Sequence, residues 1–407
     1  MQDVILITVS GEDKPGLSTS LLGVLAQYEA RILDIGQAVI HSTLSLGILT
    51  QVPEGVPWDT VARELLFRAY ELDLKIKFKP ITPEEYNEWT TAQGKERHII
   101  TLLGAVLNAD HMARLTRITR DYGLNIDVIT RLSGRIPLDG VVKPTMACVE
   151  FSVRGTSRDQ TAMRGEFLAL SHEMGVDIAF QVDDVYRRNR RLVVFDMDST
   201  LVKAEAIDEM AQAAGVAEAV ASITAATMAG DIDFEEGLAQ RLAALRGLDE
   251  SALAEIAQGI PLMDGAERLI DVLKHLGFKI AVISGGFTYF ARHLQQRLGF
   301  DYVYANELEI IDGKLTGNIV GEVINARRKA EIVREIAQKE DIRLAQVVAV
   351  GDGANDLPML AEAGLGIAFR AKPHVRETAG QALSTVGLDG ILYLIGVRDR
   401  ETLESLR

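Results

Sequence analysis

One segment constrains the fold of this chain more than any other: Arg-Leu-Val-Val-Phe-Asp-Met-Asp-Ser-Thr at residues 191–200. Four apolar residues followed directly by polar ones predict a buried strand of a parallel sheet. Asp196 and Asp198 come at the carboxyl end of this strand, and residues two apart in an extended chain point the same way. Taken alone, the pattern also fits an Asp-rich turn after a strand, so its meaning depends on the residues further along the chain.

The chain beyond residue 191 alternates between candidate strands and helices, which predicts an α/β fold with a doubly wound parallel sheet over residues 185–407. The candidate strands are Leu192–Phe195, Lys279–Ile283, Tyr302–Ala305, Val347–Val350 and Gly366–Ala368. Between the first two of them, helical periodicity occurs at Ile207–Ala214, Ala217–Met228, Phe234–Leu245 and Glu250–Ala257. A helical insertion directly after the first strand predicts a cap over the active site, at about residues 202–270.

The first half of the chain contains a diverged repeat of one β-α-β-β-α-β module. The first copy, residues 1–84, has its elements at Val4–Val9, Leu17–Tyr28, Arg31–His41, Thr43–Val52, Trp58–Asp73 and Leu74–Ile81. The second copy, residues 96–184, has them at His98–Leu103, His111–Tyr122, Leu124–Leu132, Thr145–Val153, Asp159–Gly175 and Val176–Val182. The extra length of the second copy falls in the insert Ser133–Pro144, which contains Gly and Pro. We therefore expect two ferredoxin-like modules ahead of the parallel sheet.

Composition and charge exclude several classes of partner. The net charge of −15 argues against nucleic acid or an anionic membrane, because no basic stripe is present to release counterions. Cys148 is the only cysteine, so no intramolecular disulfide can form, and a reducing cytoplasm is the expected compartment. The first residues lack a basic signal segment, and no apolar run approaches the ~20 residues of a membrane span. We expect a soluble cytoplasmic protein.

Two further segments carry groups that suit a phosphate. Ser284, Gly285 and Gly286 follow a candidate strand, where a hydroxyl and backbone amides can close on phosphate oxygens. A plain strand-to-helix turn would have the same composition. Lys329 lies near the start of a candidate helix, where the helix dipole disfavours a cation. Most lysines are solvated surface residues, so this one gains meaning only beside the other segments.

A third segment, Val-Val-Ala-Val-Gly-Asp-Gly-Ala-Asn-Asp at residues 347–356, again ends a strand with acidic residues. Asp352 can complete a Mg²⁺ site with Asp196, because hard cations prefer carboxylate oxygens. Asn355 and Asp356 follow in a glycine turn and are expected to support that site. The cation would offset the negative charge that otherwise repels a phosphate from the acids.

In this order, D-M-D-S-T, S-G-G, a lone lysine and G-D-G-x-N-D resemble the four motifs of the haloacid-dehalogenase superfamily, over about Arg191–Leu394. The resemblance implies that Asp196 is the nucleophile and Asp198 the general acid and base. It also implies that Asp196, Asp352 and the Asp198 carbonyl hold Mg²⁺. The phosphate-binding groups it implies are Ser284, Gly285, Gly286, Lys329 and Asn355.

The cap narrows the resemblance to the phosphoserine phosphatase family. Glu205 comes nine residues after Asp196, and Arg241 follows the segment 227–234. In that family a cap glutamate meets the substrate ammonium and a cap arginine meets its carboxylate, which implies hydrolysis of O-phospho-L-serine as the last step of serine biosynthesis. Arbitrary residues of these types are more often a surface acid and an exposed arginine. Met228 and Phe234 are expected to form an apolar wall that excludes water, although ordinary cap packing is the alternative.

The N-terminal modules resemble the ACT domain, an amino-acid-sensing module, through their element order and the loop Gly11–Gly16. Asp13 could meet an ammonium, and Gly16 opens a helix whose free amides suit a carboxylate. A simple N-cap and turn would need the same residues. The second copy lacks the Pro-Gly pair, and Asn108 there is either a ligand-binding residue or the cap of the next helix. The resemblance implies a homodimer and L-serine as a candidate effector.

Two rival functions remain open from the sequence alone. An amino-acid sensor with a vestigial phosphatase half would be expected to have lost at least one of Asp196, Asp198, Lys329 and Asp352, yet all four are present. A phosphatase or phosphotransferase acting on another small ester, such as phosphohomoserine or phosphothreonine, would keep the same motifs. The size of the cap pocket decides between such substrates.

Overall fold

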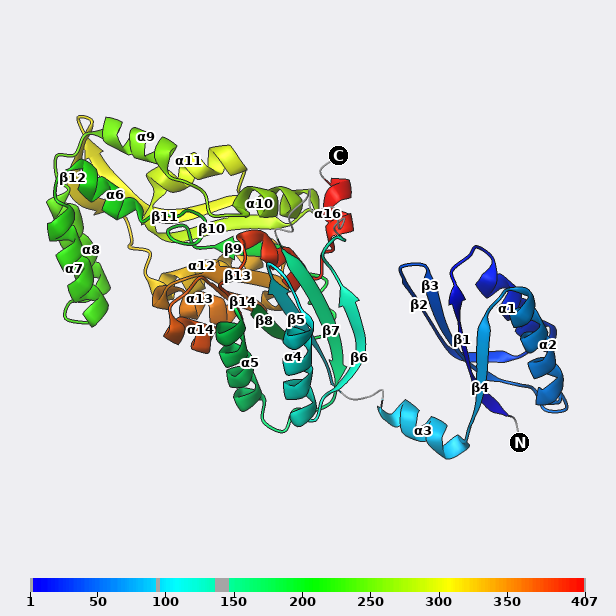
Figure 1. Ribbon diagram of the computed structural model, residues 1–407. Coiled ribbons are helices and arrows are strands. Elements are labelled where there is room, and N and C mark those ends of the chain that lie inside the picture. The colour runs from blue at the N-terminus through cyan, green and yellow to red at the C-terminus, as the bar shows by residue number, and fades with distance from the viewer. Residues whose placement is uncertain (1–2, 93–95, 136–145, 406–407) are drawn as a thin grey trace. The chain divides into compact units, whose positions relative to one another are not determined.

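The computed structural model describes residues 3–92, 96–135 and 146–405. The chain divides into two compact units, Met1–Lys95 and Glu96–Arg407, which we describe separately (Figure 1). The boundary expected near residue 184 falls inside the second unit and stays a prediction. Within the described residues, no helix is both long and apolar enough to cross a membrane.

The first unit is a four-stranded antiparallel sheet in the order β2-β3-β1-β4 with helices α1 and α2 against it. Its elements are β1 (Val4–Glu12), α1 (Leu17–Gln27), β2 (Arg31–Ile40), β3 (Thr43–Gln51), α2 (Trp58–Glu71), β4 (Lys75–Ile81) and α3 (Pro83–Ala92). Alternate residues of β1 are buried, as expected for a sheet with one covered face. The β-α-β-β-α-β order is the predicted one, whereas α3 was not predicted.

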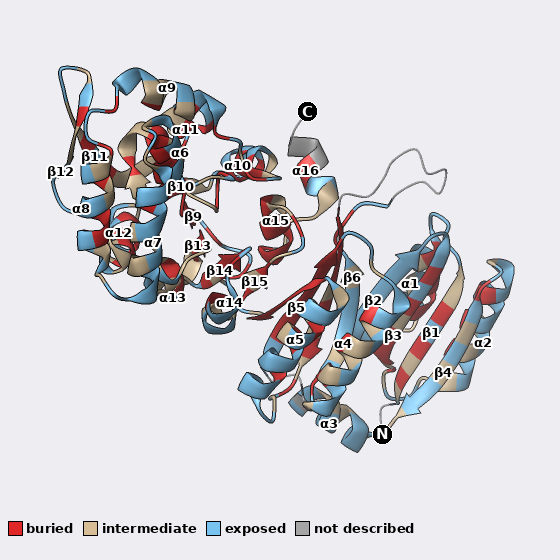
Figure 2. Cartoon of the chain, turned by 60° about the vertical axis from the view of Figure 1, so that its left-hand side comes forward, coloured by how far each residue is buried: buried red, intermediate tan, exposed pale blue. Residues whose placement is uncertain are grey.

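The second unit begins with the second copy of the module, in the matching order β6-β7-β5-β8. Its elements are β5 (Arg97–Gly104), α4 (Ala109–Asp121), β6 (Asn125–Arg131), β7 (Ala147–Arg154), α5 (Gln160–Met174) and β8 (Asp177–Val182). Unlike β1, β5 is buried on both faces from His98 to Gly104 (Figure 2). Most of the predicted insert 133–144 lies outside the described residues.

The second unit continues with a seven-stranded sheet in the order β12-β11-β10-β9-β13-β14-β15. The strands are β9 (Leu192–Phe195), β10 (Lys279–Phe287), β11 (Tyr302–Ile311), β12 (Lys314–Val320), β13 (Val347–Gly351), β14 (Leu365–Phe369) and β15 (Ala382–Leu383). All pairings are parallel except that of β12 with β11. The five predicted strands are present, and β12 and β15 are additions. All four residues of β9 are buried, as its apolar run predicts.

Helices cover the parallel sheet and form the cap. Those outside the cap are α10 (Ala266–His275), α11 (Thr288–Leu298), α12 (Ala326–Lys339), α13 (Leu357–Glu362), α14 (Pro373–Ala379), α15 (Ile391–Leu394) and α16 (Asp399–Ser405). The cap helices are α6 (Ala206–Ala213), α7 (Ala217–Ala229), α8 (Phe234–Ala244) and α9 (Glu250–Gly259), close to the predicted ranges. Strand β12 supports the cap, because Leu315 exchanges backbone hydrogen bonds with Gly247 and Leu248.

The second module is fixed to the edge of the parallel sheet where β8 meets β15. The Gln381 side chain accepts from the Phe180 amide at 2.8 Å and donates to the Phe180 carbonyl. The buried Asp177 carboxylate accepts from the amides of Ser384 and Thr385 at 2.8 and 2.9 Å and from the Thr385 hydroxyl at 2.7 Å. Side chains of the module and of the core share one hydrophobic cluster. This contact between the second module and the β15 edge of the parallel sheet, which we call the seam, is therefore hydrogen-bonded and packed like a protein interior.

We predict that Asp177→Ala lowers the free energy of unfolding by about 1–3 kcal/mol, because the backbone amides of Ser384 and Thr385 lose the carboxylate that accepts from them. Urea unfolding followed by circular dichroism measures the change. Asp271→Ala, at an exposed position of α10, is the matched control and should stay within about 0.5 kcal/mol. Equal small effects of both substitutions would show that the Asp177 hydrogen bonds do not stabilise the seam.

Candidate active site

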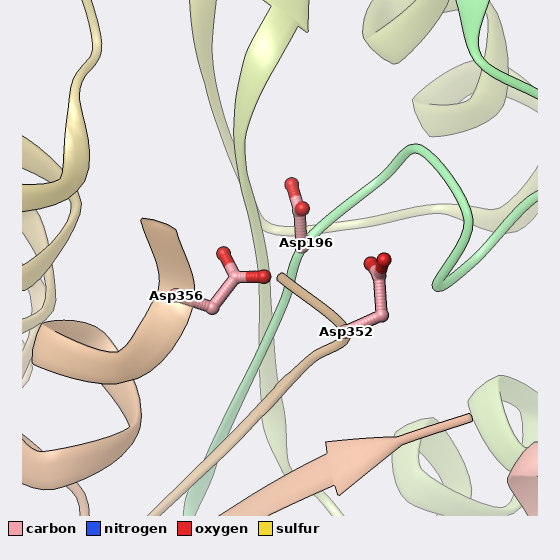
Figure 3. Close-up of side chains that lie close together, drawn as sticks. All are labelled: Asp196, Asp352 and Asp356. Atoms are coloured by element: carbon pink, nitrogen blue, oxygen red, sulfur yellow. The ribbon is translucent and has the colours of Figure 1, made fainter. Parts of the chain in front are cut away.

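Three carboxyl groups meet at the carboxyl edge of the parallel sheet (Figure 3). Asp196 follows β9 and Asp352 follows β13, and these strands are hydrogen-bonded neighbours. Asp356 comes from the short turn just before α13. One oxygen of each lies within 4.8 Å of the others, a spacing that a single cation can bridge. Asp196 and Asp352 come together because β9 and β13 are neighbouring parallel strands, which end at the same side of the sheet.

Lys329 neutralises part of this acidic cluster. Its Nζ lies 2.9 Å from Asp196 Oδ1 and 2.7 Å from Asp356 Oδ1, and the side chain is 1% exposed. Burial disfavours the charged ammonium, but the attraction of the two carboxylates outweighs it and raises the pKa of Lys329 above its usual range. Burial and the charge of Asp356 likewise raise the pKa of Asp196. The site thus holds excess negative charge that a metal ion would reduce.

The three acids differ in how many of their carboxylate oxygens are hydrogen-bonded or ion-paired. Both oxygens of Asp356 are engaged, one by Lys329 and the other by the Gly353 amide at 3.0 Å. Asp196 and Asp352 each use only Oδ1, for the Met197 amide and Lys329 in one case and for the Thr200 hydroxyl in the other. Among the described residues, Oδ2 of each has no hydrogen-bond partner. These two free oxygens are the ones available to a metal or a substrate.

Asp198 lies beside the cluster but is held differently. Its Oδ1 accepts from the Ala206 amide at 2.9 Å, and its Oδ2 lies 3.4 Å from the Ser284 hydroxyl. Burial, reinforced by the charge of Glu205, raises the pKa of Asp198 to about 7. A carboxyl group with such a pKa can donate and accept a proton near neutral pH, as a general acid and base must.

The turn after β10 is packed against these acids. The Gly286 amide donates to the buried Ser284 hydroxyl at 2.8 Å, so this amide is already engaged. A Cβ at Gly286 would lie 2.3 Å from Asp198 Oδ2, which leaves room only for glycine. Asn306 fixes the turn from behind, because its side chain donates to the Gly285 carbonyl at 2.7 Å and accepts from the Ile324 amide.

A cavity of about 690 Å³ connects this acidic floor with the cap. The predicted site residues that line it are Asp196, Asp198, Glu205, Met228, Phe234, Arg241, Ser284, Gly285, Gly286, Asp352 and Asn355. Lys329 and Asp356 are buried behind Asp196. In the cap, Glu205 accepts from the Ser199 hydroxyl at 2.6 Å. Burial lowers the pKa of Arg241, opposed by the charges of Asp208 and Glu205.

The two apolar cap residues differ in their environment. The Phe234 ring reaches the core, since its Cζ would lie 3.5 Å from a Cβ placed on Gly285. Met228 was expected to exclude water with it, but its side chain is 71% exposed. Its sulfur lies 3.7 Å from Lys372 Nζ, at the rim of the cavity. Met228 therefore lines the cavity at its solvent-exposed rim, and its part in an apolar wall that excludes water stays a prediction.

Known proteins are similar to this chain over nearly its whole length. Family models match residues 193–361 (haloacid dehalogenase-like hydrolase) and residues 3–79 and 96–181 (ACT domain in both cases). Phosphoserine phosphatase of Streptomyces coelicolor is 40% identical over 98% of this chain and 94% of its own length. Phosphoserine phosphatase SerB2 of Mycobacterium tuberculosis is 38% identical over 97% of this chain and 93% of its own. This chain belongs to the phosphoserine phosphatase family.

A solved structure agrees with that assignment. The unliganded crystal structure of a probable phosphoserine phosphatase from Vibrio cholerae has a TM-score of 0.59 and 33% identity, covering 76% of this chain and 88% of that one. The predicted fold class is thereby confirmed: a haloacid-dehalogenase-like parallel sheet with a helical cap, preceded by two ACT modules.

Several residues of this phosphatase site had no sequence signal strong enough to single them out. Thr200 belongs to the first motif, and its hydroxyl donates to Asp352 Oδ1 at 2.9 Å. Thr224 lines the cavity, and its buried hydroxyl has no hydrogen-bond partner within the described part of the chain. Lys372 and His374 line the cavity from a segment with no motif. Only the D-M-D-S-T pattern offered a clue, and only for Thr200.

The candidate ACT ligand residues lie elsewhere, and one has another role. In the first unit, Asp13 is exposed, and Gly16 is the N-cap of α1 with a φ of 92°, a conformation that favours glycine. In the second unit, Asn108 Oδ1 accepts from the His111 amide at 2.9 Å, and the His111 ring accepts from the Asn108 amide. Asn108 is therefore the N-cap of α4, the alternative its sequence left open, and its amide oxygen is not free for a ligand.

If the acidic cluster holds a divalent cation, Thr200→Val is predicted to weaken its binding about 10- to 100-fold, because Asp352 loses the hydrogen bond that orients it. Isothermal titration calorimetry with MgCl₂ measures the affinity without requiring turnover. Thr116→Val in α4, whose hydroxyl bonds only its own helix, is the control and should leave binding unchanged. Unaltered Mg²⁺ affinity of the Thr200 variant would contradict the orienting role.

Proposed function

We propose that this chain hydrolyses O-phospho-L-serine to L-serine and phosphate, the last step of serine biosynthesis. The observation that carries the proposal is one cavity with paired carboxyl groups at its floor and the charged pair Glu205 and Arg241 in its cap wall. Phosphoserine has a phosphate, an ammonium and a carboxylate. A specific site needs a cation for the first, an acid for the second and an arginine fork for the third.

The reaction proceeds in two steps. Asp196 attacks the phosphorus, the bond to the serine oxygen breaks, and Asp198 gives that oxygen its proton. The product of the first step is an aspartyl-phosphate. Water then attacks its phosphorus, Asp198 takes the water's proton, and the bond to Asp196 breaks to release phosphate. The raised pKa of Asp198 supports this double role, because the group must hold a proton in the first step and lose it afterwards.

Mg²⁺ is the cation that we propose for the floor of the site. Oδ2 of Asp196 and Oδ2 of Asp352 accept no hydrogen bond from the described residues and are proposed as ligands, and the Asp198 carbonyl is the proposed third protein ligand. Such hard oxygen donors suit Mg²⁺, which when bound offsets negative charge on the phosphate and the nucleophile. We assign Asp356 a supporting role, because both of its oxygens are already engaged by Lys329 and the Gly353 amide.

Neutral and cationic donors stabilise the transferring phosphoryl group. Lys329 contacts Asp196 directly, so its charge lies next to the proposed nucleophile, where it would stabilise negative charge on the phosphoryl group. We assign the Ser284 hydroxyl and the Gly285 amide to the same oxygens. Gly286 has a steric role instead, since its amide bonds Ser284 and its missing side chain makes room for Asp198.

Other features of the proposal stay predictions. These are the homodimer formed through the ACT modules, the cytoplasmic location, and L-serine as an effector bound near Asp13 and Gly16. Hydrolysis of another small ester, such as phosphohomoserine or phosphothreonine, is the alternative activity. Phosphate release from a panel of phosphoamino acids, with and without Mg²⁺, distinguishes these substrates.

We predict that Asp196→Asn lowers kcat for phosphoserine by more than about 1,000-fold while the protein stays folded, because an amide keeps the shape but is no nucleophile. Phosphate release and circular dichroism measure both properties. Asp231→Asn, at an exposed cap position, is the control and should retain full activity. Substantial turnover by the pure Asp196 variant would refute the assignment of the nucleophile.

We predict that Arg241→Ala lowers kcat/KM for phosphoserine by about 100-fold, since a charged hydrogen bond to the carboxylate is lost. Hydrolysis of para-nitrophenyl phosphate, which lacks that carboxylate, should change little. Arg246→Ala, an exposed residue just beyond α8, is the control for loss of a cap cation. Equal losses on both substrates would exclude a specificity role for Arg241.

A further inference from the structure

A second cavity, of about 490 Å³, lies at the seam between the second ACT module and the parallel-sheet core. Helix α5 and strand β8 form one side of it, and α14 with β15 and the residues after it form the other. Figures 1 and 2 both show α5 next to α14. The hydrogen bonds of Gln381 and Asp177 fix β8 to residues 381–385 along one part of the cavity. Its size is in the range of small-molecule sites.

Two arginines in the lining have no acidic partner. Arg164 lies over the Phe180 ring, and burial alone lowers its pKa. Its Nη1 would be 3.1 Å from a Cβ on Gly380, so it reaches the end of α14. Arg376, within α14, has a buried Nε without any hydrogen-bond partner. Neither guanidinium forms an ion pair with a described residue, although the chain carries a net charge of −15. The half-buried Arg376, with its unpaired Nε, is costly unless a ligand pairs with it, whereas Arg164 is an exposed residue that a ligand can reach from solvent.

The rest of the lining defines the complementary ligand. The Asp177 carboxylate faces the seam, but three hydrogen bonds from Ser384 and Thr385 already engage it. Glu377 is exposed, so solvent screens its charge. The side chains of Phe167 and Phe180 are buried and provide an apolar wall. The cavity therefore offers two cationic forks beside an apolar surface.

We propose that the seam cavity binds a small molecule with a carboxylate and an apolar body, and that its occupancy alters the active site through α14. The carboxylate pairs with Arg376 and Arg164, and the apolar part lies against the two phenylalanine rings. This site is separate from the loop of Asp13 and Gly16, which belongs to the other compact unit.

Helix α14 connects the two cavities. Arg376, Glu377 and Thr378 line the seam cavity, while His374 and Val375, adjacent to them in sequence, line the active-site cavity. Val375 is 1% exposed and packs in a small cluster with Ala368 and Ala371. The helix also contacts α13, which begins directly after Asp356. A ligand that pairs with Arg376 would therefore contact a seven-residue helix of which two other residues, His374 and Val375, line the active-site cavity.

Binding is tested with para-fluorobenzoate, followed by fluorine NMR on the full-length protein. We expect saturable binding that Arg376→Met and Arg164→Met each weaken at least about tenfold. Arg246→Met is the control for loss of one exposed cation, and Arg241→Met is the control for binding at the active site. Both controls should bind like the unaltered chain, and methyl para-fluorobenzoate should bind weakly. Unchanged affinity in the Arg376 and Arg164 variants, or loss of binding in Arg241→Met, overturns the proposal.

Thermal unfolding shows that the variants are folded, and the two arginine positions test the site independently. The coupling rests on the proposed phosphatase activity, so it is measured on para-nitrophenyl phosphate hydrolysis. Saturating para-fluorobenzoate should change kcat/KM at least about twofold in the unaltered chain and not in Arg376→Met. Binding without any kinetic change would refute the coupling. An inactive protein that still binds the probe would refute the proposed function and leave the seam site intact.

Discussion

The contact on which the active site depends is the bridge from Lys329 to Asp196 and Asp356. Three carboxyl groups that share a buried site repel one another, and burial alone would drive them to take up protons. The ammonium group offsets that repulsion at a fixed place and leaves one oxygen each of Asp196 and Asp352 free. The parallel strands β9 and β13 bring the acids together, and the lysine from α12 opposes their mutual repulsion. Burial and the charge of Asp356 still raise the pKa of Asp196, so the lysine offsets only part of the cost of charge at this site.

The central strand, the residues of the acidic cluster and the two N-terminal modules could be predicted from the sequence, because their signals are local. The apolar run before Asp196 indicated a central strand, and the four motifs indicated which residues meet at its end. The repeat of the β-α-β-β-α-β pattern indicated two modules. The short strands β12 and β15 were missed because two to seven residues at a sheet edge carry little periodicity. Thr224 and Lys372 were missed because only the packing of cap on core makes them neighbours of the site.

The two ACT modules show how the same pattern acquires different surroundings. In the first, β1 alternates between buried and less buried residues, whereas β5 in the second is buried on both faces. The difference arises because the second sheet packs against the core through residues such as Leu103 and Cys148. Of the two copies of the module in this chain, the second thus packs against the phosphatase core. Periodicity within either copy does not say which surface will be covered.

The loop from Asp198 to Glu205 is closed twice, by the bond of Asp198 to the Ala206 amide and by that of Ser199 to Glu205. In the proposed reaction one end of this loop protonates the ester oxygen and the other meets the ammonium. The loop therefore fixes the distance between Asp198 and Glu205, and with it the spacing between ester oxygen and ammonium that the substrate must have. A phosphorylated amine with a longer or shorter spacer would fit one end only. Discrimination by chain length then depends on the closure of this loop as well as on the size of the cap pocket.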